Sequence, residues 1–134
     1  MGDLEKATRL DPVGVLTWNA LLDEQWRIGP KMHGGYLVAL LARAAVEAVS
    51  GEGGRPDHVR PEAVTTTFLR APDPGPAVVT ADLLRAGRGV SQVRVRVEQD
   101  GTPCAEAGVT LGPATAPSDD ELGPLPVEVA AFED

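Results

Sequence analysis

Apolar residues dominate one continuous stretch of the chain. Twelve of the fourteen residues from Tyr36 to Val49 are apolar, mostly Ala and Leu, which predicts a helix beginning near Gly34. Its two charged residues, Arg43 and Glu47, are four positions apart and share one narrow polar stripe. Almost the whole circumference of the helix must therefore be covered by other protein.

The remaining apolar positions alternate with polar ones, as in half-buried strands. Before the helix, this pattern predicts a strand at 13–22 and a short strand or arm at 25–28. After the helix, Val93, Val95 and Val97 alternate with polar residues and are expected to face inward. Strands are predicted at 64–69, 77–85, 90–99 and 103–111, with Asp100 and Gly101 forming a hairpin turn.

These elements predict one α+β domain over residues 1–112. A helix that is apolar nearly all round cannot be hidden by one flat sheet, so the antiparallel sheet is expected to curl around it. A second copy of the domain would cover what remains. Residues 113–134 are rich in Pro, Ala and acids without a sustained period, which predicts a tail or linker.

Charge and cysteine content exclude several classes of function. The formal net charge of −8 repels a phosphate backbone, which excludes general nucleic-acid binding. Cys104 is the only cysteine, and with two histidines it predicts neither a disulfide nor a metal site. A reducing cytoplasm is therefore expected. The longest apolar run ends at Arg43 after seven residues, so no membrane span is predicted.

Three segments carry a resemblance to a known family. They are WRIGPKMHGGY (26–36), TTFLRAP (66–72) and LRAGRGVSQVRV (84–95). In this order and spacing they resemble the acyl-CoA thioesterase II-like family of hotdog-fold proteins, over about residues 13–112. The resemblance implies a hotdog fold, an antiparallel sheet wrapped around one long central helix. It also implies a chain with two tandem hotdogs, of which this sequence is similar to the first, so the chain is either a fragment or a homodimer; we expect the homodimer.

Thioester hydrolysis needs donors for the developing oxyanion. Gly34 and Gly35 open the predicted helix, where backbone N–H groups are unpaired and no side chain obstructs a carbonyl oxygen. The hypothesis is an oxyanion hole formed by the Gly35 and Tyr36 N–H groups. The simpler interpretation is that both glycines only permit a tight entry turn and close helix packing.

Hydrolysis also needs a group that activates water. His33 could serve as the base, or it could hydrogen bond locally at the helix entry. Many single-hotdog thioesterases carry an acidic residue near the helix, but residues 27–43 contain none. Two-domain relatives place an Asp, a Thr and a Gln in their second hotdog. An isolated domain is therefore expected to be slow or inactive, and Glu47 to form a structural or interface pair with Arg43.

Further side chains are candidates for holding water and substrate. Thr66 or Thr67 could hold water, although threonines are also ordinary strand residues. Trp26 and Phe68 could floor an acyl tunnel or simply pack the core. Arg70 and Arg88 are candidates for coenzyme A phosphates, with plain solvent exposure as the alternative.

The predicted function is hydrolysis or binding of a fatty acyl thioester of medium or long chain. Coenzyme A enters only as part of the substrate, acyl carrier protein is an equally possible carrier, and no other cofactor is expected. The alternative is a noncatalytic hotdog that supplies dimerisation surface and part of an acyl tunnel. The missing acids favour this alternative, whereas the His-Gly-Gly entry favours hydrolysis.

Overall fold

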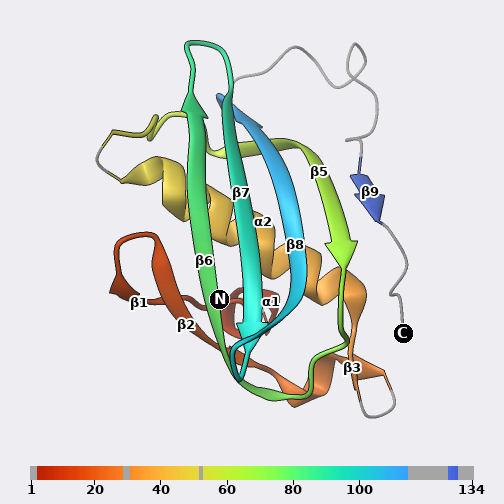
Figure 1. Ribbon diagram of the computed structural model, residues 1–134. Helices are drawn as coiled ribbons and strands as arrows, with labels where there is room; N and C mark the ends of the chain where they lie inside the picture. The colour runs from red at the N-terminus through yellow and green to blue at the C-terminus, as the bar shows by residue number, and fades with distance from the viewer. Residues whose placement is uncertain (1–2, 29–30, 52, 115–126, 130–134) are drawn as a thin grey trace.

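One long helix lies across one face of a curved, mainly antiparallel sheet (Figure 1). The computed structural model describes residues 3–28, 31–51, 53–114 and 127–129. The elements in chain order are α1 (Asp3–Ala7), β1 (Asp11–Gly14), β2 (Thr17–Leu22), the 3-10 helix η1 (Glu24–Trp26), β3 (Arg27–Ile28), β4 (Lys31–Met32), α2 (Gly34–Ser50), β5 (Arg60–Phe68), β6 (Gly75–Ala86), β7 (Ser91–Gln99), β8 (Thr102–Gly112) and β9 (Val127–Val129). The predicted α+β class is confirmed.

Helix α2 matches the predicted helix and forms one side of the core. Leu37, Leu40 and Leu41 are fully buried against the sheet, as the apolar run requires. The opposite side of the helix is only half-buried, along a stripe of small apolar side chains: Val38, Ala39, Ala42 and Val46. The described residues therefore leave incomplete the cover that was expected over nearly the whole circumference.

The large sheet has the strand order β1-β2-β6-β7-β8-β5-β9. Its inward side chains alternate as predicted, and Val93, Val95 and Val97 are almost completely buried. The turn between β7 and β8 has positive φ at both Asp100 (52°) and Gly101 (77°), the geometry that a tight hairpin requires. The four strands predicted after the helix are confirmed, with β5 and β6 longer than expected.

The prediction of one strand over 13–22 is wrong. The segment is a hairpin of β1 and β2, and the chain turns at Leu16, which has a φ of 48°. A non-glycine residue in this conformation gives no composition signal, so the turn was hidden. The predicted arm at 25–28 begins instead with η1, capped by the Asp23 carboxylate, which accepts from the Gln25 N–H at 3.0 Å.

Helix α1 was not predicted, and it packs beside α2. The Tyr36 hydroxyl donates to the Ala7 carbonyl oxygen at 2.6 Å, and Arg43 donates to the Glu5 carbonyl oxygen at 2.6 Å. Arg43 therefore hydrogen bonds to α1 instead of pairing with Glu47 as expected. The Glu47 side chain is exposed.

Strand β8 ends at Gly112, and the segment predicted to be a tail follows it. Three of its residues form β9, which pairs in parallel with β5. Residues 115–126 and 130–134 of that segment lie outside the described residues. Among the residues that are described, no helix has the length and apolarity needed to cross a bilayer.

Candidate functional site

His33 caps the N-terminal end of α2. Its backbone is extended, its Nδ1 accepts a hydrogen bond from the Tyr36 N–H at 3.3 Å, and its own N–H donates to the Trp26 carbonyl oxygen at 2.8 Å. The cap satisfies one of the first N–H groups of the helix, which have no acceptor inside it. The local hydrogen bond expected of His33 is therefore present.

This cap also limits the chemistry that His33 can perform. A neutral imidazole that accepts at Nδ1 carries its proton on Nε2, as inferred from the hydrogen bond. The ring can donate from Nε2 to a ligand oxygen, but it can act as a base only by giving up the cap. The side chain is exposed, so a ligand can reach it.

Gly34 and Gly35 leave little free space for a side chain at the helix entry. A Cβ on Gly35 would lie 2.8 Å from His33 Cε1, and one on Gly34 would lie 3.2 Å from Phe68 Cζ. Within the described part of the chain, neither glycine N–H has an acceptor. The Tyr36 N–H, one of the two donors expected for the oxyanion hole, is already bonded to His33. The Gly34 and Gly35 N–H groups are the two that remain available to a ligand oxygen.

Two aromatic rings stack at this end of the helix. Trp26 and Tyr36 stack with centroids 6.0 Å apart and planes 8° apart. Desolvation raises the pKa of Tyr36, which is buried and bonded to Ala7. The Trp26 Nε1 atom is buried and has no partner among the described residues.

Strand β5 passes beneath the same end of the helix. Thr66 and Phe68 face inward; the Thr66 side chain is fully buried, and its Oγ1 has no partner within the described ranges. Thr67 faces the other side of the strand and is exposed. Thr66 and Thr67 therefore lie on opposite faces of β5, and only Thr66 faces the interior.

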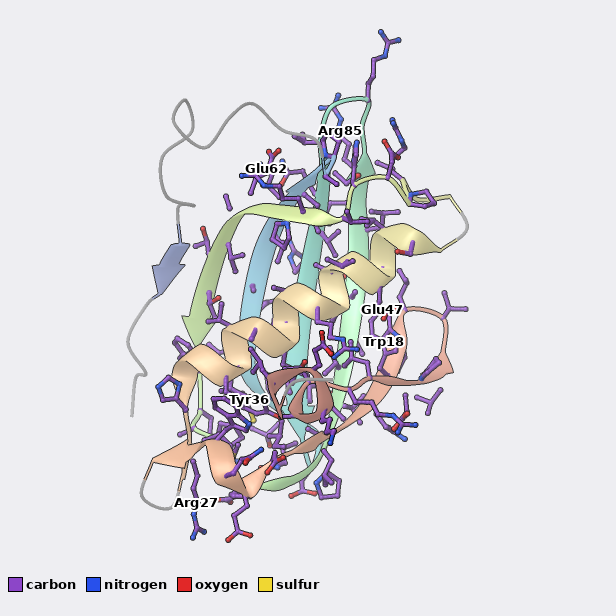
Figure 2. The ribbon with its side chains drawn as sticks, turned by 180° about the vertical axis from the view of Figure 1, so that it is seen from behind. Trp18, Arg27, Tyr36, Glu47, Glu62 and Arg85 are labelled. Carbon is purple, nitrogen blue, oxygen red and sulfur yellow. The ribbon has the colours of Figure 1, made fainter. Side chains whose placement is uncertain are left out.

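The two candidate phosphate-binding arginines are far apart. Arg70 lies two residues after Phe68, whose ring is next to Gly34 at the helix start, and its backbone N–H donates to the Cys104 carbonyl oxygen at 3.1 Å. Arg88 lies in the β6–β7 hairpin. Figure 2 shows Arg85, at the base of that hairpin, and Tyr36 at opposite ends of the molecule. Helix α2 has 17 residues, which corresponds to a length of about 25 Å.

A buried polar pair at this far end of α2 was not predicted. His58 Nδ1 and Ser91 Oγ lie 2.8 Å apart, and both side chains are fully buried. The available signal was the alternation of β7, because Ser91 occupies the same inward set as Val93 and Val95. An inward serine requires a partner.

Two hollows lined by described residues lie away from the helix start. One of about 570 Å³ is lined by Glu5, Lys6, Arg9 and Arg43 beside α1. Another of about 400 Å³ lies by β2, β6 and the β7–β8 turn, and its lining includes Ala20, Val78 and Glu98. Neither contains the predicted site residues.

Comparison with known proteins identifies relatives of this chain. Residues 22–112 match the family model described as the acyl-CoA thioesterase N-terminal domain. Uncharacterized proteins of Mycobacterium tuberculosis and Mycobacterium bovis are 44% identical over 91 residues, which is 68% of this chain. The match spans only 31% of the length of those relatives, so the matched segment corresponds to less than a third of each relative.

Solved structures show the same fold. A Thermobifida fusca protein, named provisionally as a thioesterase II, is 28% identical with a TM-score of 0.74, covering 87% of this chain and 42% of its own. A hot dog fold protein of Alicyclobacillus acidocaldarius has the same TM-score at 20% identity, covering 88% of this chain and 42% of its own. A conserved protein of Pseudomonas aeruginosa, with a TM-score of 0.70 at 24% identity, is matched over 84% of this chain and 94% of its own length. The hotdog prediction is confirmed.

Proposed function

The chain belongs to the acyl-CoA thioesterase N-terminal domain family, and from this we propose that it binds a fatty acyl thioester at the start of α2 and takes part in its hydrolysis. The observation that carries the proposal is the pair of N–H groups on Gly34 and Gly35, which have no acceptor among the described residues. They lie at the positive end of a 17-residue helix, where an oxyanion is stabilised.

The proposed reaction is attack by water on the thioester carbonyl carbon. The carbonyl oxygen becomes an oxyanion that accepts from the Gly35 N–H, with the Gly34 N–H or the His33 Nε2–H as the second donor. The carbon–sulfur bond then breaks, and the thiolate takes up a proton as the acid is released. The proton removed from water is proposed to go to a base outside residues 27–43, because that segment has no carboxylate and His33 would have to give up its hydrogen bond from the Tyr36 N–H to accept it.

The acyl chain is proposed to enter beside Phe68 and Thr66, with Trp26 flanking the entrance. The burial of Phe68 supports this path. So does the Thr66 hydroxyl, which has no hydrogen-bond partner among the described residues and could be satisfied by a ligand or water in a channel. Either coenzyme A or acyl carrier protein could present the thioester.

A homodimer is proposed to complete the site. The half-buried stripe on α2 supports it, because a second copy could cover this stripe. The distance between Arg88 and Gly35, which lie at opposite ends of α2, also supports it, because one protomer alone does not bring them together. With antiparallel helices, a two-fold axis would set the Arg88 end of one protomer near the Gly35 end of its partner. We further propose a reducing, cytoplasmic setting, because Cys104 is a free, buried thiol.

The Gly35→Pro variant, which lacks the N–H, tests whether Gly35 stabilises the oxyanion. Its rate of hydrolysis is compared with that of the wild type on acyl-CoA substrates of graded chain length. The expected loss in kcat is about 100-fold. Gly35→Ala is the matched control, because it adds the same Cβ near His33 and keeps the N–H. Full turnover by the proline variant, with its helix intact by circular dichroism, would remove Gly35 from the mechanism.

A noncatalytic role is the second candidate, and the absence of a carboxylate from residues 27–43 favours it. Binding of acyl-CoA without turnover by the wild-type chain would select this role. Light scattering tests the dimer: Ala42→Glu on the half-buried stripe is expected to give monomers, and a wild-type monomer at micromolar concentration would refute the assembly.

A further inference from the structure

The far end of α2 contains a polar cluster that is separate from the site at Gly35. His58, in the segment between α2 and β5, is hydrogen bonded to Ser91 at the start of β7. Both side chains are fully buried. This bond therefore fixes the loop after α2 to the C-terminal base of the β6–β7 hairpin.

A second tether joins the same loop to the same hairpin. Arg55 donates from Nη1 to the Gly87 carbonyl oxygen at 2.9 Å. Its Nε and Nη2 atoms donate to the two carboxylate oxygens of Asp57 at 3.1 and 3.0 Å. This two-point ion pair orients the guanidinium, and the Arg55 hydrogen bond lowers the pKa of the Asp57 carboxyl.

The hairpin is closed tightly where the tethers meet it. The Gly87 N–H donates to the Val90 carbonyl oxygen at 3.0 Å, and a Cβ on Gly87 would lie 2.6 Å from that oxygen. The exposed residue Arg88 therefore sits on a turn of fixed shape whose two sides are both held by the loop.

His58 is poorly explained as a packing residue. Its Nε2 is buried and has no hydrogen-bond partner among the described residues, and the nearest carboxylate oxygen, Asp57 Oδ2, is 3.8 Å away. An unsatisfied buried polar atom destabilises a fold, and an apolar side chain of similar shape would avoid this cost. The bond to Ser91 is therefore the feature that the imidazole specifically provides.

The charge of the hairpin indicates the chemistry that it serves. The chain has a formal net charge of −8, yet Arg85 and Arg88 lie in or beside the turn and Arg55 supports it. Guanidinium groups match phosphate oxygens in shape and charge. An anionic, phosphate-bearing ligand is the chemistry that fits this surface.

We propose that Arg55, Asp57 and His58 are positioning residues that set the β6–β7 hairpin so that Arg88 binds the phosphates of coenzyme A. This rests on the proposed function for the identity of the ligand and on the proposed homodimer, which would set the Arg88 end of one protomer near the Gly35 end of its partner. The positioning itself rests only on the tethers to Gly87 and Ser91.

Hydrogen exchange of the ligand-free protein tests the positioning independently of activity. Arg55→Met and His58→Leu are each expected to speed exchange of the Gly87 amide, which is bonded within the turn, by about tenfold. Amides of Leu40 and Leu41 in α2 should be unchanged. His58→Asn, which can still bond Ser91, is expected to restore much of the protection. Unchanged Gly87 exchange in both tether variants would overturn the proposal.

Binding of coenzyme A, with pantetheine as the phosphate-free probe, tests the ligand. Arg88→Met and Arg55→Met are each expected to weaken coenzyme A by about tenfold, or roughly 1.4 kcal/mol, and to leave pantetheine unchanged. Arg55→Lys should recover part of the loss. Equal losses for both probes would overturn the phosphate assignment.

Failure of the two proposals can be told apart. A wild-type chain that binds neither acyl-CoA nor coenzyme A would overturn the proposed function and the ligand assigned to Arg88. Gly87 exchange would then show whether the tethers still hold the hairpin.

Discussion

The two ends of α2 differ in how their polar groups are used. At the N-terminal end, the Gly34 and Gly35 N–H groups have no acceptor among the described residues, and the one side-chain cap comes from exposed His33. At the C-terminal end, Arg55 and His58 bind the neighbouring hairpin, and His58 is fully buried. The first end is arranged to receive a ligand, and the second to hold a surface in place.

Phe68, which lies next to the N-terminal end of α2, gives the largest expected effect on stability. Phe68→Ala removes a ring that is 3% exposed and packs against the Gly34 backbone, so the free energy of unfolding should fall by about 3–5 kcal/mol. Urea unfolding measures it. Leu69→Ala, at a side chain that is 44% exposed, should change it by less than about 0.5 kcal/mol. Similar losses in both variants would contradict the burial described for Phe68.

Glycine substitutions compare the two ends directly. A Cβ on Gly54 would collide with the Val49 backbone carbonyl, which cannot move freely, whereas a Cβ on Gly35 meets only the exposed His33 ring. Gly54→Ala should therefore lower the unfolding free energy by about 1–3 kcal/mol, with Gly35→Ala close to neutral in thermal melts. Gly51→Ala is the control, because its Cβ would lie 3.8 Å from the nearest atom. A Gly54→Ala protein as stable as Gly51→Ala would argue against close packing of Gly54 on the Val49 backbone at the C-terminal end of α2.

Removing the cap should have a smaller effect. His33→Ala deletes the acceptor of the Tyr36 N–H and is expected to destabilise the fold by about 1 kcal/mol. His33→Asn, which restores a capping side chain, should recover most of this in the same urea titration. If His33→Asn were as unstable as His33→Ala, the imidazole would be stabilising the entry by another contact.

The smallest effect is a change in titration beside the cap. Burial raises the pKa of Tyr36, the only tyrosine of the chain, so phenolate absorbance should rise at a pH above its usual value of about 10. Because the folded-state pKa is the higher one, this contribution to stability is complete below about pH 10 and is lost as the pH rises through the folded-state value. Tyr36→Phe is the spectral blank. Titration at the ordinary value in a folded chain would place the hydroxyl in solvent.

The elements that were predicted correctly are those with a strong period. The apolar run of α2 and the alternation of β7 both follow from what each residue must bury, and neither depends on a distant contact. Leu16 is different, because its positive φ is imposed by the β1–β2 hairpin and leaves no mark in composition. Helix α1 has only five residues, too few to show a period. Its hydrogen bonds to Tyr36 and Arg43 are long-range contacts, which the sequence does not reveal.

The candidate site was predicted in part. The His-Gly-Gly segment located the helix entry, but the sequence could not show that the His33 ring would occupy the Tyr36 N–H. The alternation of β5 puts Thr66 and Thr67 on opposite faces of the strand, so only Thr66 of these two candidates faces inward. His58 lies in a loop without periodicity, so its pairing with Ser91 could be inferred only from the inward position of that serine.

The strand order also determines how the chain must fold. Strands β6, β7 and β8 are joined by short turns and can pair early, whereas β2 pairs with β6 only after the whole of α2 and β5 has been passed. Closing such a long loop carries an entropic cost before any contact repays it. The β6–β7–β8 meander is therefore expected to nucleate folding, and the β1–β2 hairpin to dock late, which makes the N-terminal strands the first to detach in partial unfolding.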